Sequence, residues 1–418
     1  MNRTYICIDI KSFFASVECV ERKLDPFTTN LVVADESRGK GTICLAVSPK
    51  MKMLGVKNRC RLFQIPNNIK YIMAKPRMSK YIEYAANIYS IYLKYVSKDD
   101  IHVYSIDEAF LDVTQYLNTY KKNGIELAKL ILRDIYTSYG ITATAGIGTN
   151  LYLSKIALDI LSKHNASNIG YLDEDTYIKA LWYYEPLSDF WQVGKGIEKR
   201  LKKLRIKNMY DITRTNPKIL YKEFGINAEL LIDHAWGKET CTISDIKRYK
   251  PKSNSISTNQ VLFKDYTWNE ARLVLKEMVE LKSLELVEKN LVTDTLTLYI
   301  GYSNNIIKPS GGTYKISLKT NTFTELLKGF MSLYDKTTNM FMPIRRIGIG
   351  FEKVEEEKYI QMDFFIDRNK IEKERKVEGA ISNIRAELGN NAILKGMNLE
   401  VGATTKLRNT LIGGHNAK

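Results

Sequence analysis

The sequence predicts a multidomain α+β protein, and three observations support this prediction. The chain has 418 residues, enough for two or more domains that each bury a core. Its first 165 residues mix strand and helix patterns, whereas residues 253–356 follow the order β-α-β-β-α-β. Between these parts lie short helices separated by Gly and Pro, and then the polar, basic stretch TISDIKRYKPKSNSIS, which is typical of a linker.

The first half begins with a strand over residues 5–10, because Tyr5, Cys7 and Asp9 alternate with three isoleucines. A helix follows from Phe13, where apolar residues recur at helical spacing. Short strands and glycines over residues 23–75 suggest an inserted subdomain. Further helices are expected at 78–97, 124–138 and 151–163, and further strands at 101–106 and 141–147.

The second half begins with a small all-α unit at about residues 170–240. After the linker we expect an α+β sandwich with helices on one face of a sheet. Its elements are a first strand, a helix at 267–289, strands at 295–303 and 312–320, a helix at 323–335 and a strand at 344–354. A polar tail over 366–418 carries one helical stretch at about 371–387 and ends in a loop.

The composition narrows the class of protein. No apolar run is long enough to cross a bilayer and the N-terminus lacks a signal-peptide cleavage site, so a cytoplasmic location is expected. Five scattered cysteines and four histidines argue against a disulfide framework or a zinc site. A net charge of +16 suggests a polyanionic partner, with nucleic acid favoured over an anionic membrane, although AT-rich coding also enriches lysine.

Two acidic elements indicate chemistry. Asp9 lies where the first strand meets the first helix, and Asp107 and Glu108 interrupt the strand-like run VYSIDEAFLDV. Neighbouring residues on a regular strand point to opposite faces, so both acids serve one site only if the chain turns there, as at a hairpin tip. Three converging carboxylates would need a divalent cation, and oxygen-only ligands favour Mg²⁺ or Mn²⁺. Spacing alone leaves open that all three are capping and turn residues.

The residues around these acids resemble a known family. DIKSFFASVE and SIDEAFLDV are similar to the two catalytic motifs of the Y-family, or translesion, DNA polymerases. CLAVSPKMKMLGVKNRCRLFQIP, TATAGIGTNLYLSKIALDILSKH and LSDFWQVGKGIEKRLKKLRI resemble that family's fingers, palm end and thumb, in the same order. The tail NNAILKGMNLEVGATTKLRNTLIGGH resembles the UmuC-like (ImpB/MucB/SamB) branch of low-GC bacteria, their phages and plasmids. Five ordered motifs make chance a poor explanation.

The resemblance implies a right-hand polymerase whose domains can be assigned along the chain. The expected ranges are palm 1–22 and 76–165, small fingers 23–75, all-α helix-hairpin-helix thumb 166–240, linker 241–252, βαββαβ little finger 253–360, and clamp-binding motif with C-terminal tail 361–418.

The resemblance also implies the active-site roles. Asp9, Asp107 and Glu108 would hold two Mg²⁺ ions, for which Mn²⁺ is a possible substitute, and the Ile10 carbonyl would be a further ligand. Phe14 would be the steric gate against a 2′-hydroxyl, supported from below by Phe13. The alternative, that the rings are core residues of the first helix, fits Phe13 better than Phe14.

Contacts to the incoming nucleotide are implied for Ile43 and Leu45 as the roof over the base pair, and for Ser48, Lys52 and Lys163 at the triphosphate. The sequence departs from the family here. Ser12 and Pro49 stand where many members have tyrosine, Lys52 replaces an arginine, and Lys163 aligns only after a one-residue shift.

DNA would be gripped by the hairpin around Gly194, Lys195 and Gly196, unless this is an ordinary helix connector, and by Arg345 and Arg346, each of which could equally be a solvated charge. The stretch QMDFF resembles peptides that dock on the bacterial sliding clamp (beta); alternatively its two phenylalanines complete a core. The clamp-docking residues would be Gln361, Met362, Phe364 and Phe365.

The sequence therefore predicts a low-fidelity DNA polymerase that uses primer-template DNA and dNTPs to copy past DNA damage, as in an SOS response. The sliding clamp and, as for some UmuC-like enzymes, a UmuD-like accessory subunit are the further partners that the resemblance implies. Two alternatives remain. A non-catalytic DNA- and clamp-binding protein of the same fold would not need the acids, and a palm-like nucleotidyl cyclase would need neither the thumb hairpin nor the basic C-terminal domain.

Overall fold

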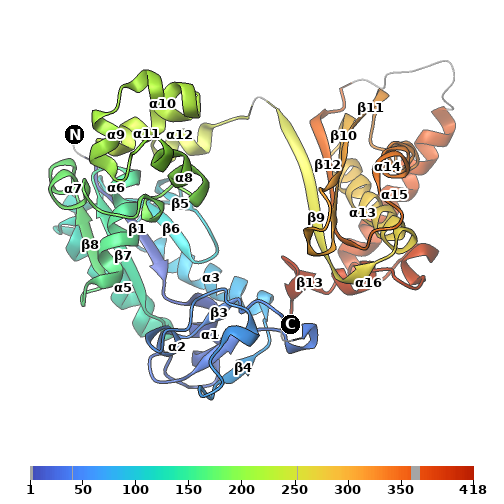
Figure 1. Cartoon of the computed structure of the whole chain (residues 1–418). Coiled ribbons are helices and arrows are strands. Elements are labelled where there is room, and N and C mark those ends of the chain that lie inside the picture. The colour runs from blue at the N-terminus through green and yellow to red at the C-terminus, as the bar shows by residue number, and fades with distance from the viewer. Residues whose placement is uncertain (1–2, 40, 252, 359–367) are drawn as a thin grey trace. The chain divides into compact units, whose positions relative to one another are not determined.

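The computed structural model describes residues 3–39, 41–251, 253–358 and 368–418. The chain forms two compact units, one of Met1–Tyr249 with Asn416–Lys418 and one of Lys250–His415 (Figure 1). None of the helices in the described ranges has the length and apolar character needed to span a membrane. The predicted QMDFF peptide, residues 361–365, lies outside the described residues.

The first unit is built around a five-stranded sheet with the strand order β5-β6-β1-β7-β8. Its strands are β1 Tyr5–Ile10, β5 Ile101–Val103, β6 Glu108–Asp112, β7 Ala143–Gly148 and β8 Ile169–Leu172. The central strand β1 is antiparallel to β6 and β7, and β7 is parallel to β8. The strand predicted at residues 5–10 is therefore confirmed and lies at the middle of the sheet.

The two faces of this sheet follow the alternation seen in the sequence. Ile6, Ile8 and Ile10 pack into the main core with the helices α1 Phe13–Glu21, α3 Met78–Tyr92 and α5 Gly124–Tyr139. The opposite face carries Tyr5 and Cys7 and is covered by α6 Leu151–Ile156. A short helix, α4 Leu117–Tyr120, precedes α5.

Helix α6 lies unusually close to the sheet because β7 carries glycines beneath it. A Cβ atom on Gly146 would lie 2.1 Å from the Ser154 carbonyl oxygen, and one on Gly148 would lie 2.2 Å from the Ser154 nitrogen. These contacts with backbone atoms exclude any larger residue without moving the helix. The helix then continues as a π-helical turn, Ala157–Leu161, and a 3-10 turn, Ser162–His164, so the helix predicted at 151–163 is present but irregular.

The inserted subdomain holds a small sheet with the order β3-β2-β4 and one short helix. Its elements are β2 Leu31–Val33, β3 Ala46–Val47, α2 Pro49–Met53 and β4 Ile72–Ala74. Val32, Cys44, Val47 and Met51 form a separate small core there. The all-α part that follows the five-stranded sheet contains α7 Glu174–Leu181, α8 Lys195–Lys203, α9 Met209–Arg214, α10 Pro217–Phe224 and α11 Asn227–Ala235.

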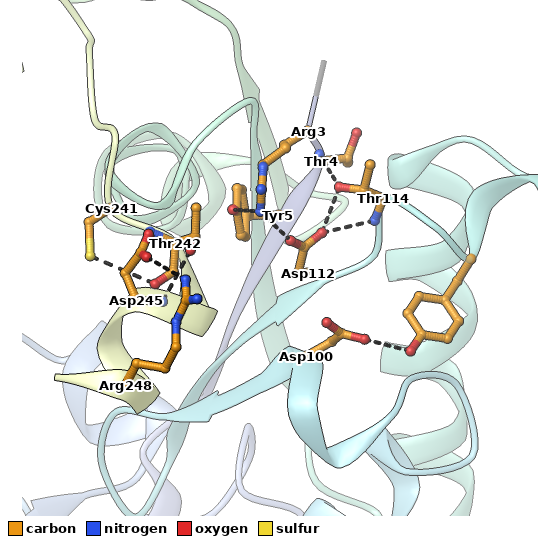
Figure 2. Close-up of polar contacts among 11 residues, drawn as sticks. Arg3, Thr4, Tyr5, Asp100, Asp112, Thr114, Cys241, Thr242, Asp245 and Arg248 are labelled. Carbon is orange, nitrogen blue, oxygen red and sulfur yellow. Dashed lines mark hydrogen bonds and ion pairs between the residues drawn. The ribbon is translucent and has the colours of Figure 1, made fainter. Parts of the chain in front are cut away.

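The expected linker at 241–252 needs correction, because its first half forms helix α12, Ile243–Arg248. Figure 2 shows the capping box that begins this helix, in which the Asp245 nitrogen donates to Thr242 Oγ1 at 3.2 Å and the Thr242 nitrogen donates to Asp245 Oδ2 at 3.1 Å. Ile243 is buried against Tyr5 and Phe110 of the first sheet. Ile246 of the same helix packs partly buried against this cluster, so two isoleucines and the capping box hold a helix that is only six residues long, too short to show a clear apolar period.

The second unit is an antiparallel four-stranded sheet with the order β11-β10-β12-β9. Two helices, α13 and α14, lie on one side of it (Figure 1), and Ile347, Ile349 and Phe351 point into the core between them. This confirms the predicted α+β sandwich. Its elements are β9 Asn254–Tyr266, α13 Trp268–Glu288, β10 Leu291–Tyr302, β11 Ser310–Thr320, α14 Phe323–Thr337 and β12 Ile344–Glu356.

Most of the expected polar tail, from Arg368 to His415, belongs to the second unit. It forms α15 Arg368–Leu388, α16 Thr405–Arg408, β13 Leu411–Ile412 and β14 His415–Asn416. Glu277 on α13 is fully buried, and its carboxylate accepts hydrogen bonds from the Thr404 nitrogen at 2.7 Å, the Thr405 nitrogen at 3.1 Å and Asn398 Nδ2 at 3.1 Å. The tail packs through polar pairing, which explains its lack of an apolar pattern.

Candidate active site

The acids of the two sequence motifs meet at one end of the first sheet. Asp9 on β1 lies directly opposite Glu108 on β6, and the Ile10 nitrogen donates to the Asp107 carbonyl at 3.0 Å. Asp107 precedes β6 in a tight turn, where the Tyr104 nitrogen donates to the Glu108 carbonyl at 2.9 Å. The chain therefore turns at Asp107 and Glu108, at the tip of the β5–β6 hairpin.

Asp9 carries a raised pKa. Burial raises the pKa of Asp9 to about 7, and the Asp107 and Glu108 carboxylates add to this rise, whereas the Lys163 and Lys155 ammonium groups oppose it. Asp107 is held by Ser105, whose hydroxyl donates to Asp107 Oδ1 at 2.7 Å. Negative charge is thus crowded at this end of the sheet, and a divalent cation would relieve that crowding.

Glu108 has a partner that the sequence did not reveal. Lys155 Nζ on α6 lies 2.7 Å from Glu108 Oε1, and Cys7 Sγ donates to the same oxygen at 3.3 Å. Burial alone would lower the pKa of Lys155, but the Asp159 and Glu108 carboxylates hold that pKa above its ordinary value.

The three acids together do not form a complete metal cage. Within the described part of the chain, no three Asp, Glu, His or Cys side chains are gathered closely enough to hold an ion by themselves. Mg²⁺ typically takes one or two carboxylates and completes its shell with water and substrate phosphates. These oxygen donors fit Mg²⁺. Asp9 and Asp107 are the first candidates for ligands, and Glu108 lies beside them.

A third acid of the SIDEAFLDV motif, Asp112, stabilises the sheet. It lies at the other end of β6, where it accepts hydrogen bonds from the Thr114 nitrogen at 3.1 Å and Thr114 Oγ1 at 2.6 Å (Figure 2). Arg3 also approaches it at 3.3 Å. Asp112 thus stabilises the start of β1 and the end of β6, away from Asp9.

Three lysines surround the acidic end. The charges of Asp9, Lys163, Lys11 and Asp107 all act on Lys52, whose pKa is lowered chiefly by burial of its ammonium group. Lys163 pairs with Asp159 Oδ1 at 2.9 Å and remains 46% exposed. Lys11, which the sequence did not single out, donates to Asn168 Oδ1. This cationic group beside the carboxylates is suited to bind a polyphosphate.

Helix α1 begins at Phe13, only four residues after Asp9. Ser12 adopts the left-handed conformation, with φ of 50°, which ends the strand and starts the helix within two residues. Phe13 is only 2% exposed and lies in the core, whereas Phe14 is half-buried and stacks on Tyr81 with ring centroids 4.6 Å apart. The rings therefore have different surroundings, and only Phe14 keeps an accessible edge.

One of the residues expected to contact the nucleotide, Ser48, caps a helix. Ser48 is fully buried, and its hydroxyl donates to the Thr29 carbonyl at 2.7 Å while it caps α2 by accepting from the Met51 nitrogen at 3.3 Å. Ser48 is thus a structural capping residue. Ile43, in contrast, is 47% exposed, and Leu45 is partly buried against the main core.

The expected DNA contacts are at accessible positions. Gly194 is the N-cap of α8, and a Cβ atom on Gly194 or Gly196 would meet nothing within 4 Å, so packing does not require glycine at either position. In the second unit, Arg346 is exposed beside Val261, whereas Arg345 pairs with Asp265 at 3.5 Å.

Comparison with known proteins agrees with this arrangement. Residues 8–159 match the model of the impB/mucB/samB family, and residues 253–364 match that of its C-terminal domain. The "Putative UV-damage repair protein UvrX" of Bacillus subtilis is 31% identical over 420 residues, covering 99% of this chain and 98% of the relative. "DNA polymerase IV 2" of the same organism is 26% identical over 425 residues, covering 99% of each.

Solved structures show the same fold. A Y-family DNA polymerase chimera of Dbh and Dpo4 matches with a TM-score of 0.65 at 23% identity, covering 84% of this chain and 99% of that chain. An insertion ternary complex of Dbh DNA polymerase matches with a TM-score of 0.52 at 22% identity, covering the same shares. The architecture is that of a Y-family DNA polymerase. Within that class, the chain belongs to the impB/mucB/samB family, which confirms the resemblance seen in the sequence.

Proposed function

We propose that the protein is a template-directed DNA polymerase that copies past damaged bases by nucleotidyl transfer from dNTP to a primer 3′-hydroxyl. The observation that carries this proposal is the position of Asp9 opposite Glu108, with Asp107 on the adjoining turn, at a sheet end flanked by lysines. Membership of the impB/mucB/samB family supports it.

Asp9, Asp107 and Glu108 would hold two Mg²⁺ ions, or Mn²⁺ in their place, with the Ile10 carbonyl as an added ligand. Such ions would lower the pKa of the primer hydroxyl and neutralise charge on the triphosphate. Lys52 and Lys163 would bind the triphosphate as point charges. Phe14 would exclude a ribose 2′-hydroxyl, and Ile43 and Leu45 would cover the nascent base pair.

DNA would be held without sequence readout. Backbone N–H groups at the start of α8, near Gly194, Lys195 and Gly196, would bind a phosphate, and Arg345 and Arg346 would contact the DNA backbone. Docking on a sliding clamp through residues 361–365, a UmuD-like partner and action in the cytoplasm, where its DNA substrate lies, rest on the sequence motifs and complete the proposal.

Primer extension with Mg²⁺ tests this function. The purified chain should extend a primed template, and Asp9→Ala and Asp107→Ala should abolish extension while DNA binding persists. Unchanged extension by both variants would show that these acids are not the catalytic site. Salt-dependent binding of DNA without extension would instead favour a non-catalytic binding protein.

A further inference from the structure

Three consecutive ion pairs connect Glu108, one of the candidate metal ligands, to Lys163, one of the candidate triphosphate ligands. Lys155 Nζ lies 2.7 Å from Glu108 Oε1 and 2.9 Å from Asp159 Oδ2. Asp159 Oδ1 in turn lies 2.9 Å from Lys163 Nζ. We call Glu108, Lys155, Asp159 and Lys163 the ion-pair ladder. Neither Lys155 nor Asp159 was singled out from the sequence.

The ladder is fixed in place by backbone packing. Lys155 is only 7% exposed, and the helix that carries it is pressed on the sheet at Gly146 and Gly148, where a Cβ atom would approach backbone atoms of the helix to 2.1 and 2.2 Å. A Cβ atom on Gly170 would likewise lie 2.4 Å from the Ala157 carbonyl oxygen. The Lys155 ammonium therefore has little freedom to move relative to β6.

A π-helical turn lies just before Lys163 and contains Asp159. In the turn Ala157–Leu161, the Ser162 nitrogen donates to the Ala157 carbonyl, five residues earlier, so the helix accommodates one extra residue. Lys163 matches the triphosphate lysine of the family only after a one-residue shift, and we infer that the extra residue of this turn accommodates that shift. Turns of this type are frequently found at functional sites.

We propose that Lys155 and Asp159 are positioning residues of the active site. Lys155 fixes Glu108 through Oε1, and the other oxygen, Oε2, takes no part in the ladder and is the one we assign to a cation. Asp159 uses its second oxygen to hold Lys163 where a triphosphate would lie. Outer partners of this kind orient metal ligands, and their loss typically costs about 10- to 100-fold in metal affinity or activity. The inference rests on the proposed polymerase function.

Lys155→Met is the first test. We expect Mn²⁺ binding, measured by electron paramagnetic resonance of free Mn²⁺ without DNA or nucleotide, to weaken by about tenfold or more. In primer extension, kcat should fall and half-saturating Mg²⁺ should rise, while the dNTP KM changes little. Lys155→Arg should restore part of both losses, because it keeps the charge. Lys94→Met, which removes an exposed pair with Asp134 at 3.2 Å, is the matched control and should change neither.

Asp159→Asn is the second test and remains informative if Lys155→Met does not fold, because the Asp159 side chain is 22% exposed. It should raise the dNTP KM more than it lowers kcat, since Lys163 loses the partner that places it.

Three results would overturn the inference. The first is tighter Mn²⁺ binding by Lys155→Met, which would mean that the lysine only repels the cation. The second is unchanged Mn²⁺ binding and kinetics in both variants, and the third is a lowered melting temperature as the only effect. Failure of the wild-type chain to extend primers would instead overturn the proposed function. The Mn²⁺-binding measurement would still test the role of Lys155 in that case.

Discussion

The Glu18 carboxylate accepts two hydrogen bonds from the Arg77 guanidinium, at 2.9 and 3.0 Å, although the residues are 59 positions apart. Tyr81 OH donates to the same carboxylate at 2.8 Å, and Arg22 also binds it. Glu18 is fully buried, so this network ties α1, which carries Phe14, to α3. The sequence motif contained Glu18, but only the fold shows its role as an anchor.

Replacement of Glu18 should therefore destabilise the first unit. Glu18→Ala leaves two arginines and a tyrosine without their partner, and we expect a loss of about 3–5 kcal/mol, measured by urea denaturation. Glu21→Ala is the control, because Glu21 pairs with Arg77 at 3.7 Å and with Lys80 at 3.9 Å, and its side chain is 24% exposed. Its carboxylate also accepts a hydrogen bond from the Tyr84 hydroxyl at 2.8 Å. The control variant should cost less than about 1 kcal/mol. Equal losses in the two variants would contradict the anchor role.

Phe14 should control sugar selection. Phe14→Ala removes the ring stacked on Tyr81 and should raise incorporation of ribonucleotides relative to deoxyribonucleotides by at least about tenfold, as measured by single-nucleotide primer extension. Phe13→Leu is the control, because Phe13 is 2% exposed: it should lower stability without changing sugar selection. A changed ribonucleotide preference in Phe13→Leu alone would reverse the assignment.

The glycines at the start of α8 should matter for DNA binding and not for folding. A Cβ atom at Gly196 would meet nothing within 4 Å, so Gly196→Ala should leave the fold intact and even stabilise α8 by up to about 1 kcal/mol. We expect weaker duplex binding, measured by fluorescence anisotropy at several salt concentrations. Gly379→Ala in α15, where a Cβ is equally unobstructed, should give a similar stability change with unaltered DNA affinity.

The C-terminal segment should be required for the second unit. Deletion of residues 389–418 removes the groups that donate to the buried Glu277 carboxylate, including Thr404 and Asn398, and should cost about 3 kcal/mol or more. Urea denaturation followed by circular dichroism would measure this. Deletion of 411–418 alone keeps those donors and should cost much less. A full-length stability in the longer deletion would mean that the segment is an appendage.

Glu378 should make stability depend on pH. Burial, and then the nearby Glu374 carboxylate, raise the pKa of Glu378 to about 7, and the side chain is 3% exposed. In the unfolded chain this group ionises near its ordinary pKa of 4.5. Below that pH both states are protonated, so the group has no effect. As the pH rises towards about 7 the unfolded chain releases the proton first, so folding becomes less favourable by about 3 kcal/mol and stays so above pH 7.

Glu378→Gln tests this pH dependence. The variant cannot ionise, so its free energy of unfolding should change less between pH 5 and pH 8 than that of the wild-type chain, and it should be the more stable of the two at pH 8. Parallel curves for the two proteins in urea titrations would show that Glu378 is not responsible.

Many helices and strands could be predicted from the sequence, because the spacing of apolar residues indicates which side of an element is buried. The strand predicted at 5–10 is β1, and the helix predicted at 267–289 is Trp268–Glu288. The elements that were missed are held by polar contacts. Helix α12 has only six residues and depends on a capping box and two isoleucines, Ile243 and Ile246. The C-terminal segment docks through hydrogen bonds to Glu277. Neither leaves a clear periodic pattern in the sequence.

The sequence by itself determined the order of the main structural elements, the family, and Asp9, Asp107 and Glu108 as the candidate metal ligands, because short local motifs carry this information. Only the tertiary structure decided what each side chain contacts. It placed the Ser48 side chain in the interior of the inserted subdomain and buried Phe13 in the core while it left Phe14 partly exposed. It also brought Lys155 to Glu108, which is 47 positions earlier in the chain. Such pairings depend on how closely a helix can approach a sheet, and here two glycines on β7 set that distance.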